Sequence, residues 1–175
     1  MNIKIEKAGI GHIEEITQLY DSLNDYLAAT VNYPGWKKGI YPIREDALKG
    51  ISEDSLYVAL DHGKIAGSII LNHEPENGYG SVNWTSNEDY CKIYVIHTLA
   101  VEPYYLKKGI GEGLMQFSIE QGRRDGMKAL RLDVYEKNSP AIKLYEKLGF
   151  SYAGTADLGY SSYGLDRFRL YERCL

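Results

Sequence analysis

Apolar residues recur along the chain with the spacings of helices and strands. Between residues 10 and 28 they return every three or four positions, which predicts a helix with one face packed inward. Residues 92–101, KIYVIHTLAV, are apolar at nearly every position, as expected of a central strand covered on both faces. Residues 56–60 and 65–74 predict two strands joined by a tight turn that contains Gly63.

The rest of the chain continues these patterns. Ser139 is predicted to cap a helix that has Pro140 in its first turn and ends at Gly149. The remaining patterns predict a strand over 3–8, a short helix over 44–51, a helix from a glycine-rich loop to about residue 125, and strands over 129–135, 151–158 and 166–175. Strands and helices therefore mix along the chain, with no repeat and no long linker. We expect one α/β domain over residues 1–175.

Composition narrows the class of partner. The net charge of −4 argues against nucleic acid, since domains that bind it usually carry a basic face. No apolar run approaches the length of a membrane span, and the first residues lack the apolar core of a signal peptide, so we expect a cytoplasmic protein. Sixteen tyrosines against three phenylalanines are compatible with a pocket lined by tyrosine, or with tyrosines spread over core and surface.

Metal and cysteine chemistry have no support in the sequence. No cluster of histidine, cysteine or carboxylate residues has the spacing of metal ligands, so we expect no metal. Cys91 and Cys174 lack metal or redox spacing and are not near a plausible base in the sequence. A covalent cysteine intermediate is therefore not expected.

The stretch LKKGIGEGL, residues 106–114, places three glycines within five residues before a helix. It is not a dinucleotide-binding loop, because the glycines are spaced G-x-G-x-G and seven residues separate them from the preceding strand. A helix start with exposed N–H groups can instead hold a phosphate, helped by the helix dipole and by Lys107 and Lys108. From the residues alone, a plain glycine-rich turn explains the stretch as well.

Three stretches resemble the GNAT superfamily of N-acetyltransferases: IHTLAVEPYYLKKGIGEGL, LRLDVY and NSPAIKLYEKLGF. The resemblance implies a mixed, mostly antiparallel central sheet that is flanked by helices and splayed where the cofactor binds. It also implies acetyl-CoA as the acyl donor. Two motifs in the expected order and at the expected separation are more specific than the glycine loop alone.

The resemblance assigns the residues that contact acetyl-CoA. The loop would bind the pyrophosphate, a strand segment would pair with the pantetheine arm, and Asn138 would touch the cofactor. The first position of the family's loop signature, usually Gln or Arg, is Leu106 here, so Lys107 and Lys108 are expected to compensate in part. The full set comprises Leu99, Ala100, Val101, Lys107, Lys108, Gly109, Ile110, Gly111, Glu112 and Asn138.

Acetyl transfer to an amine also needs an acid and often a base. Tyr145 matches the family position that protonates the departing thiolate, although it also suits a core position on an apolar helix face. His97 is our first candidate for the base, because histidine titrates near neutral pH. Glu74 and His73 are the other candidates, and Asp133 is expected to be structural.

The acceptor is expected to be a small-molecule primary amine that attacks the thioester directly in a ternary complex. Family analogy places the loop YPGWKKGIYP at the acceptor, and the residues expected to line the site are Tyr33, Trp36, Tyr41, His73 and Trp84. Two alternatives stay open: a sensor that binds acyl-CoA without turnover, and an acetyltransferase of protein N-termini. A homodimer is expected by family analogy alone.

Overall fold

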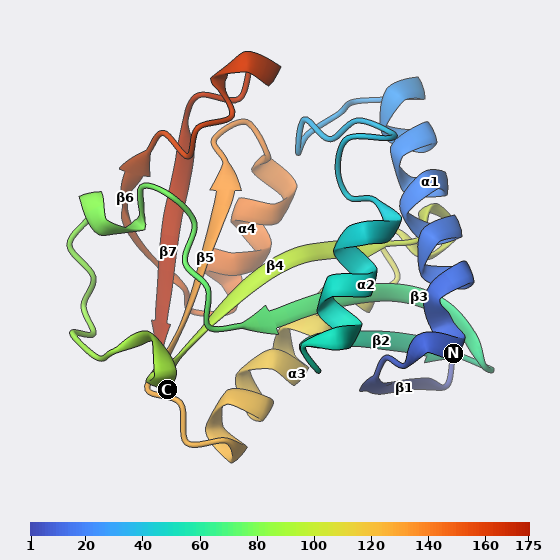
Figure 1. The fold of residues 1–175 in the computed structure, drawn as a ribbon, viewed down its shortest axis with the longest axis horizontal. Helices are drawn as coiled ribbons and strands as arrows, with labels where there is room; N and C mark the ends of the chain where they lie inside the picture. The colour runs from blue at the N-terminus through green and yellow to red at the C-terminus, as the bar shows by residue number, and fades with distance from the viewer. The chain divides into compact units, whose positions relative to one another are not determined.

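The computed structural model describes every residue from Met1 to Leu175, and its elements follow the predicted order (Figure 1). The helices are α1 (Ile13–Ala29), α2 (Arg44–Ser52), α3 (Ile110–Arg124) and α4 (Ser139–Lys147). The strands are β1 (Ile3–Lys7), β2 (Leu56–Asp61), β3 (Lys64–Asn72), β4 (Ile93–Val101), β5 (Ala129–Tyr135), β6 (Ser151–Ala156) and β7 (Phe168–Cys174). No helix is both long enough and apolar enough to cross a membrane.

Seven strands form one sheet in the order β1-β2-β3-β4-β5-β7-β6. The pairs β1–β2, β2–β3, β5–β7 and β6–β7 are antiparallel, whereas β4 and β5 are parallel. The parallel register joins Ile93–Ile96 to Ala129–Leu132 and stops there, although β4 continues to Val101. The predicted mixed, mostly antiparallel sheet is therefore confirmed, and only the first half of β4 pairs with β5.

The chain divides into two compact units. The first comprises residues 1–32, 36–71 and 97–117, and the second comprises residues 33–35, 72–96 and 118–175. Strand β4 and helix α3 each contribute residues to both units. Whether residues 1–175 act as a single domain stays a prediction.

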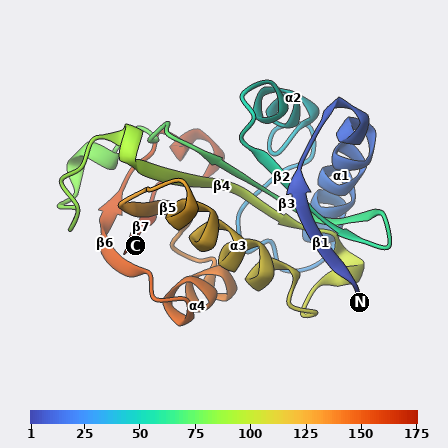
Figure 2. The same cartoon turned by 90° about the horizontal axis from the view of Figure 1, so that it is seen from below.

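In the first unit, α1 and α2 cover one face of β1, β2 and β3 (Figure 2). The apolar stripe predicted for α1 is buried there, with Ile16 fully shielded from solvent. The start of α3 packs on the other face, where Gly67 of β3 has no room for a side chain. A Cβ at Gly67 would lie 2.8 Å from the Ala100 carbonyl oxygen and 2.9 Å from Ile110 Cγ2. This close contact holds β3, β4 and the start of α3 together.

In the second unit, the segment of residues 73–92 covers one face of β5 and β7. Tyr79 of this segment is buried against Leu158, Phe168 and Leu170. On the other face, Gly122 of α3 leaves so little space that a Cβ would lie 2.8 Å from Leu175 Cδ1. Helix α4 lies on the same side as α3 (Figure 2).

Two helix starts differ from the sequence prediction. Residues 10–12 form a 3₁₀ turn, and α1 begins only at Ile13. The N-cap of α4 is Asn138 rather than the predicted Ser139, because the Asn138 side chain accepts a hydrogen bond from the Ala141 N–H at 3.4 Å. Ser139 becomes the first helical residue, followed by Pro140. Asparagine and serine cap helices about equally well, so propensity could not separate the two positions.

Candidate active site

The glycine loop leads from β4 into α3 and leaves open space beside its backbone. Lys107 and Gly109 both have left-handed backbone conformations, with φ of 61° and 84°. Gly109 is therefore explained by its conformation, which favours glycine. A Cβ added at Gly109 or at Gly113 would meet no atom within 4 Å. Nothing in the protein fills the space that these two glycines leave.

The start of α3 is suited to an anion. The Gly113 N–H bonds to the Gly109 carbonyl at 2.9 Å. The first turn of a helix carries the positive end of the helix dipole, which attracts an anion. Lys108 adds a cation at this place, and its Nζ lies 3.6 Å from the centre of the Tyr104 ring. The open space, the N–H groups and the lysine together fit the pyrophosphate of acetyl-CoA.

Strand β4 changes its backbone direction just before the three residues predicted to pair with the pantetheine arm. Thr98 has a left-handed conformation with φ of 48°, although it lies inside the strand. Its hydroxyl is hydrogen-bonded to the hydroxyl of Tyr41, which comes from the loop before α2. In the following segment Ala100 is fully buried, whereas Leu99 and Val101 are half-buried.

In the second unit, Tyr145 of α4 is a buried tyrosine. The Tyr145 side chain is only 7% exposed, and its ring packs near Phe150 with centroids 6.1 Å apart. Burial, and to a lesser extent the charge of Asp133, raise the pKa of Tyr145 well above its ordinary value. The phenol therefore keeps its proton throughout the physiological pH range.

Asp133 on β5 is itself held in place by a buried tyrosine. The Tyr79 hydroxyl donates to Asp133 Oδ1 at 2.8 Å, and burial raises the pKa of Tyr79, with the Asp133 charge as the next cause. Sequence reasoning took Asp133 as structural and did not single out Tyr79. A lone carboxylate in an otherwise apolar strand was the available signal, but its partner lies 54 residues away. This hydrogen bond fits the structural role predicted for Asp133, whose charge also contributes to the raised pKa of Tyr145.

The three predicted candidates for a base have different surroundings. His97 lies on β4 and is half-buried. The Nδ1 of His73 lies 2.8 Å from both the Tyr90 and the Ile93 carbonyl oxygens, so it must carry a proton to donate to them. Glu74 is exposed, and its backbone N–H donates to Asn72 Oδ1 at 3.0 Å. One ring nitrogen of His73 is therefore hydrogen-bonded to the backbone of the residues at the start of β4 and just before it.

The residues predicted for the acceptor lie in both units. Trp36 and Tyr41 meet edge to face, with ring centroids 5.4 Å apart, in the first unit. Tyr33 and Trp84 belong to the second unit, where Tyr33 is 39% exposed. The assignment of all five residues to the acceptor site stays a prediction.

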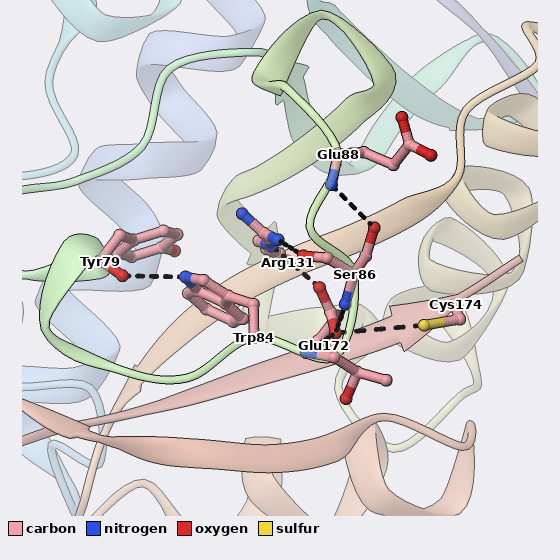
Figure 3. Close-up of polar contacts among 8 residues, drawn as sticks. Tyr79, Trp84, Ser86, Glu88, Arg131, Glu172 and Cys174 are labelled. Carbon is pink, nitrogen blue, oxygen red and sulfur yellow. Dashed lines mark hydrogen bonds and ion pairs between the residues drawn. The ribbon is translucent and has the colours of Figure 1, made fainter.

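Trp84 belongs to a buried ionic network (Figure 3). Its ring faces the Arg131 guanidinium, whose central carbon lies 4.3 Å from the ring centroid. Arg131 donates from Nε to Glu172 Oε1 at 3.0 Å and from Nη2 to the Ser86 carbonyl at 2.7 Å. Glu172 Oε2 also accepts the N–H groups of Thr85 and Ser86 at 2.8 and 3.1 Å. The network fastens this part of the segment 73–92 to β5 and β7.

An open cavity of about 280 Å³ lies against this network. Its lining is polar apart from a valine and a tryptophan, and consists of Val82, Asn83, Trp84, Ser86, Asn87, Glu88 and Arg131. No group of three or more histidine, cysteine or acidic side chains is arranged to hold a metal ion. Both cysteines are exposed thiols.

Comparisons with known proteins agree with the fold and with these motifs. Residues 16–150 match the profile of the family described as acetyltransferase (GNAT) family. The chain is 29% identical over 137 residues to an uncharacterized N-acetyltransferase of Methanocaldococcus jannaschii, covering 74% of this chain and 57% of the relative. It is 32% identical over 114 residues to the S-(2-succino)cysteine N-acetyltransferase of Bacillus subtilis, covering 64% of each.

A third relative acts on a protein. The [ribosomal protein bS18]-alanine N-acetyltransferase of Escherichia coli is 38% identical over 58 residues, which are 33% of this chain and 39% of the relative. The chain thus spans less than two thirds of the length of each of these relatives.

Two solved structures show the same fold. A GNAT-family acetyltransferase of Streptococcus agalactiae superposes with a TM-score of 0.81 at 20% identity, over 99% of this chain and 95% of that one. The Salmonella typhimurium protein yncA, solved with its cofactor acetyl-CoA, superposes with a TM-score of 0.71 at 17% identity, over 99% and 94%. Because the family profile spans most of the chain, this protein belongs to the acetyltransferase (GNAT) family.

Proposed function

We propose that this protein transfers the acetyl group of acetyl-CoA to a small-molecule primary amine, by direct attack within a ternary complex. The observation that carries the proposal is the buried phenol of Tyr145 on α4, at the position that the family resemblance assigns to the acid. Its raised pKa keeps it protonated, as a general acid must be before it donates. The open glycine loop before α3 supports acetyl-CoA as the donor.

The role of each group follows from the proton balance. The attacking amine loses one proton, and the departing thiolate gains one. Tyr145 is proposed to donate to the thiolate sulfur, and the N–H of Leu99 to stabilise the developing oxyanion. His97 remains the first candidate for the base, with Glu74 as the carboxylate candidate.

The need for a base depends on the acceptor. Deprotonating an alkyl amine of pKa about 10.4 at pH 7 costs about 4.6 kcal/mol, whereas an α-amine near 7.9 costs only about 1.2 kcal/mol. A base, or a site that removes water from the ammonium, is therefore needed mainly for alkyl amines. The aromatic pair of Trp36 and Tyr41 suits the apolar part of a small acceptor. The relative named for S-(2-succino)cysteine supports a small-molecule amine.

A second candidate is acetylation of protein N-termini, which the match to the ribosomal protein bS18-alanine N-acetyltransferase favours. The identity lies within one third of the chain, so it supports this acceptor class less than it supports the family. Leu106, in place of the usual Gln or Arg, favours instead a sensor that binds acyl-CoA without turnover. A cytoplasmic location and a homodimer stay predictions.

One experiment separates these functions. Calorimetric titration with acetyl-CoA, and with pantetheine that lacks the pyrophosphate, measures donor binding. Release of free thiol is then followed with alkyl amines, free amino acids and short peptides of free N-terminus. Binding that depends on the pyrophosphate, with thiol release on small amines, supports the proposal. Release on peptides alone favours the second candidate, binding without release favours the sensor, and no binding refutes all three.

A further inference from the structure

We propose that Tyr41 is a positioning residue for acetyl transfer. Its hydroxyl holds Thr98 of β4 in the left-handed conformation, and this conformation sets the direction of the N–H of Leu99. The inference rests on the proposed function, since it takes Leu99 to Val101 as the segment that faces the donor. It adds to that function a connection between the loop before α2 and the backbone of β4.

The conformation of Thr98 is the first step. Its φ of 48° lies in the left-handed region, which a β-branched residue rarely adopts because its side chain crowds the backbone. The burial pattern of β4 shifts by one residue between Val95 and Ile96, so the regular alternation of the strand is broken just before Thr98. Such strain persists only where surrounding contacts hold the residue in place.

The contact with Tyr41 supplies this restraint. The two hydroxyl groups are hydrogen-bonded, although their residues are 57 positions apart. Thr98 is 6% exposed, so this bond is shielded from water. The bond is therefore positioned to keep the Thr98 side chain, and with it the backbone, from relaxing into the extended conformation.

Tyr41 can act as a restraint because it is itself anchored. Asn24, which is buried on α1, donates from Nδ2 to the Tyr41 carbonyl at 3.4 Å. The Trp36 ring packs against the Tyr41 ring with an angle of 82° between their planes. The backbone and the ring of Tyr41 are thus fixed separately, and the hydroxyl has a defined position relative to β4.

The consequence concerns the residue after Thr98. Rotation about the Thr98 backbone would turn the peptide plane that carries the Leu99 N–H, and a catalytic donor must be aimed at the charge that develops. An acceptor that touches Tyr41 would touch the residue that sets the direction of this N–H. Acceptor binding and oxyanion stabilisation would thus share one structural element.

The test is a rescue experiment with three variants. Tyr41→Phe is expected to lower kcat about tenfold, the effect of losing one hydrogen bond of net worth about 1.4 kcal/mol, while KM for the acceptor changes less than threefold. Thr98→Val, which keeps the crowded side chain but loses the hydroxyl, is expected to have the same effect. Adding Thr98→Gly to Tyr41→Phe is expected to restore kcat to within threefold of wild type, because glycine adopts positive φ without strain.

A second measurement does not depend on turnover. Deuterium uptake of the peptide spanning residues 96–102 should rise in Tyr41→Phe and stay unchanged in the control Tyr26→Phe, whose ring is exposed on α1. If the glycine variant does not fold, Thr98→Asn replaces it, since asparagine also tolerates this conformation.

Three outcomes would overturn the proposal. The first is a lack of rescue by glycine or asparagine at position 98, and the second is a rise of KM without a change in kcat, which would make Tyr41 a direct acceptor contact. The third is unchanged deuterium uptake in Tyr41→Phe. If the wild-type protein releases no thiol at all, the proposed function fails, and the uptake measurement still decides whether Tyr41 holds Thr98.

Discussion

Replacing Tyr145 by phenylalanine tests the proposed acid with little disturbance of the fold. The ring remains, so its packing near Phe150 is retained and only a hydroxyl is removed. Deleting one such group changes the free energy of unfolding by about 1 kcal/mol, which for a domain of this size shifts the melting temperature by about 2–4 °C. A larger effect on turnover would therefore come from chemistry.

The size of that effect follows from the two pKa values. A phenol of ordinary pKa near 10 gives its proton to a thiolate whose thiol has a pKa near 8.5 at a cost of about 2 kcal/mol. Burial and Asp133 raise the pKa of Tyr145 further, so the transfer is harder still. We therefore expect a loss of kcat near the lower end of the range for general acids, about 10²-fold or about 2.7 kcal/mol.

The assay is the initial rate of thiol release at saturating acetyl-CoA and amine, together with calorimetric binding of acetyl-CoA. Tyr171→Phe is the matched control, because Tyr171 is also buried and its hydroxyl donates to Glu146 Oε1 at 2.9 Å. The control should lose stability but keep kcat. If Tyr145→Phe retains kcat within threefold while it binds acetyl-CoA normally, Tyr145 is a core residue and the acid must be sought elsewhere.

Three further predictions concern the fold and the cofactor loop. Arg131→Met leaves the buried Glu172 carboxylate without its cation and should lower the free energy of unfolding in urea by about 3–5 kcal/mol; a loss below 1 kcal/mol would contradict this. Gly113→Ala meets open space within a helix, so it should raise that free energy by roughly 0.5–1 kcal/mol in the absence of acetyl-CoA, whereas a loss of stability would show that the space is not open. Burial raises the pKa of Tyr20 and Tyr79 in the folded state, so their contribution is complete below pH 10 and lost at higher pH. Urea unfolding measured between pH 9 and 11 should show the free energy of unfolding of the wild type falling above pH 10, by up to about 1.4 kcal/mol per pH unit for each tyrosine. In Tyr79→Phe this free energy should fall less steeply with pH. A fall as steep as that of the wild type would contradict the reasoning.

The sequence by itself determined which segments form helices and strands. The apolar stripe of α1 and the nearly continuous apolar run of β4 are local patterns with the period of their element, so no distant residue is needed to interpret them. The glycine loop was also visible, because a positive φ favours glycine, as found at Gly109. The order of the elements and the family resemblance then indicated the mixed sheet.

The tertiary structure decided which polar side chains meet. Arg131 and Glu172 are 41 residues apart, Tyr79 and Asp133 are 54 apart, and Tyr41 approaches Thr98 across 57 residues. Each pairing depends on strand order, register and the course of a long loop. Residue patterns within one element contain none of this information.

Contacts between distant residues also decide the surroundings of Trp84, Asp133 and Thr98. The sequence predicts Trp84 as an acceptor contact, and this stays a prediction, whereas the contact of its ring with the buried Arg131 guanidinium is made only by the fold. The sequence predicted a structural role for Asp133, and only the fold shows that the Tyr79 hydroxyl bonds to it and that its charge contributes to the raised pKa of Tyr145. The left-handed backbone of Thr98 runs against the preference of threonine, and only contacts made after folding can stabilise it. Local preference thus determined the elements, whereas long-range contacts determined the chemistry that they carry.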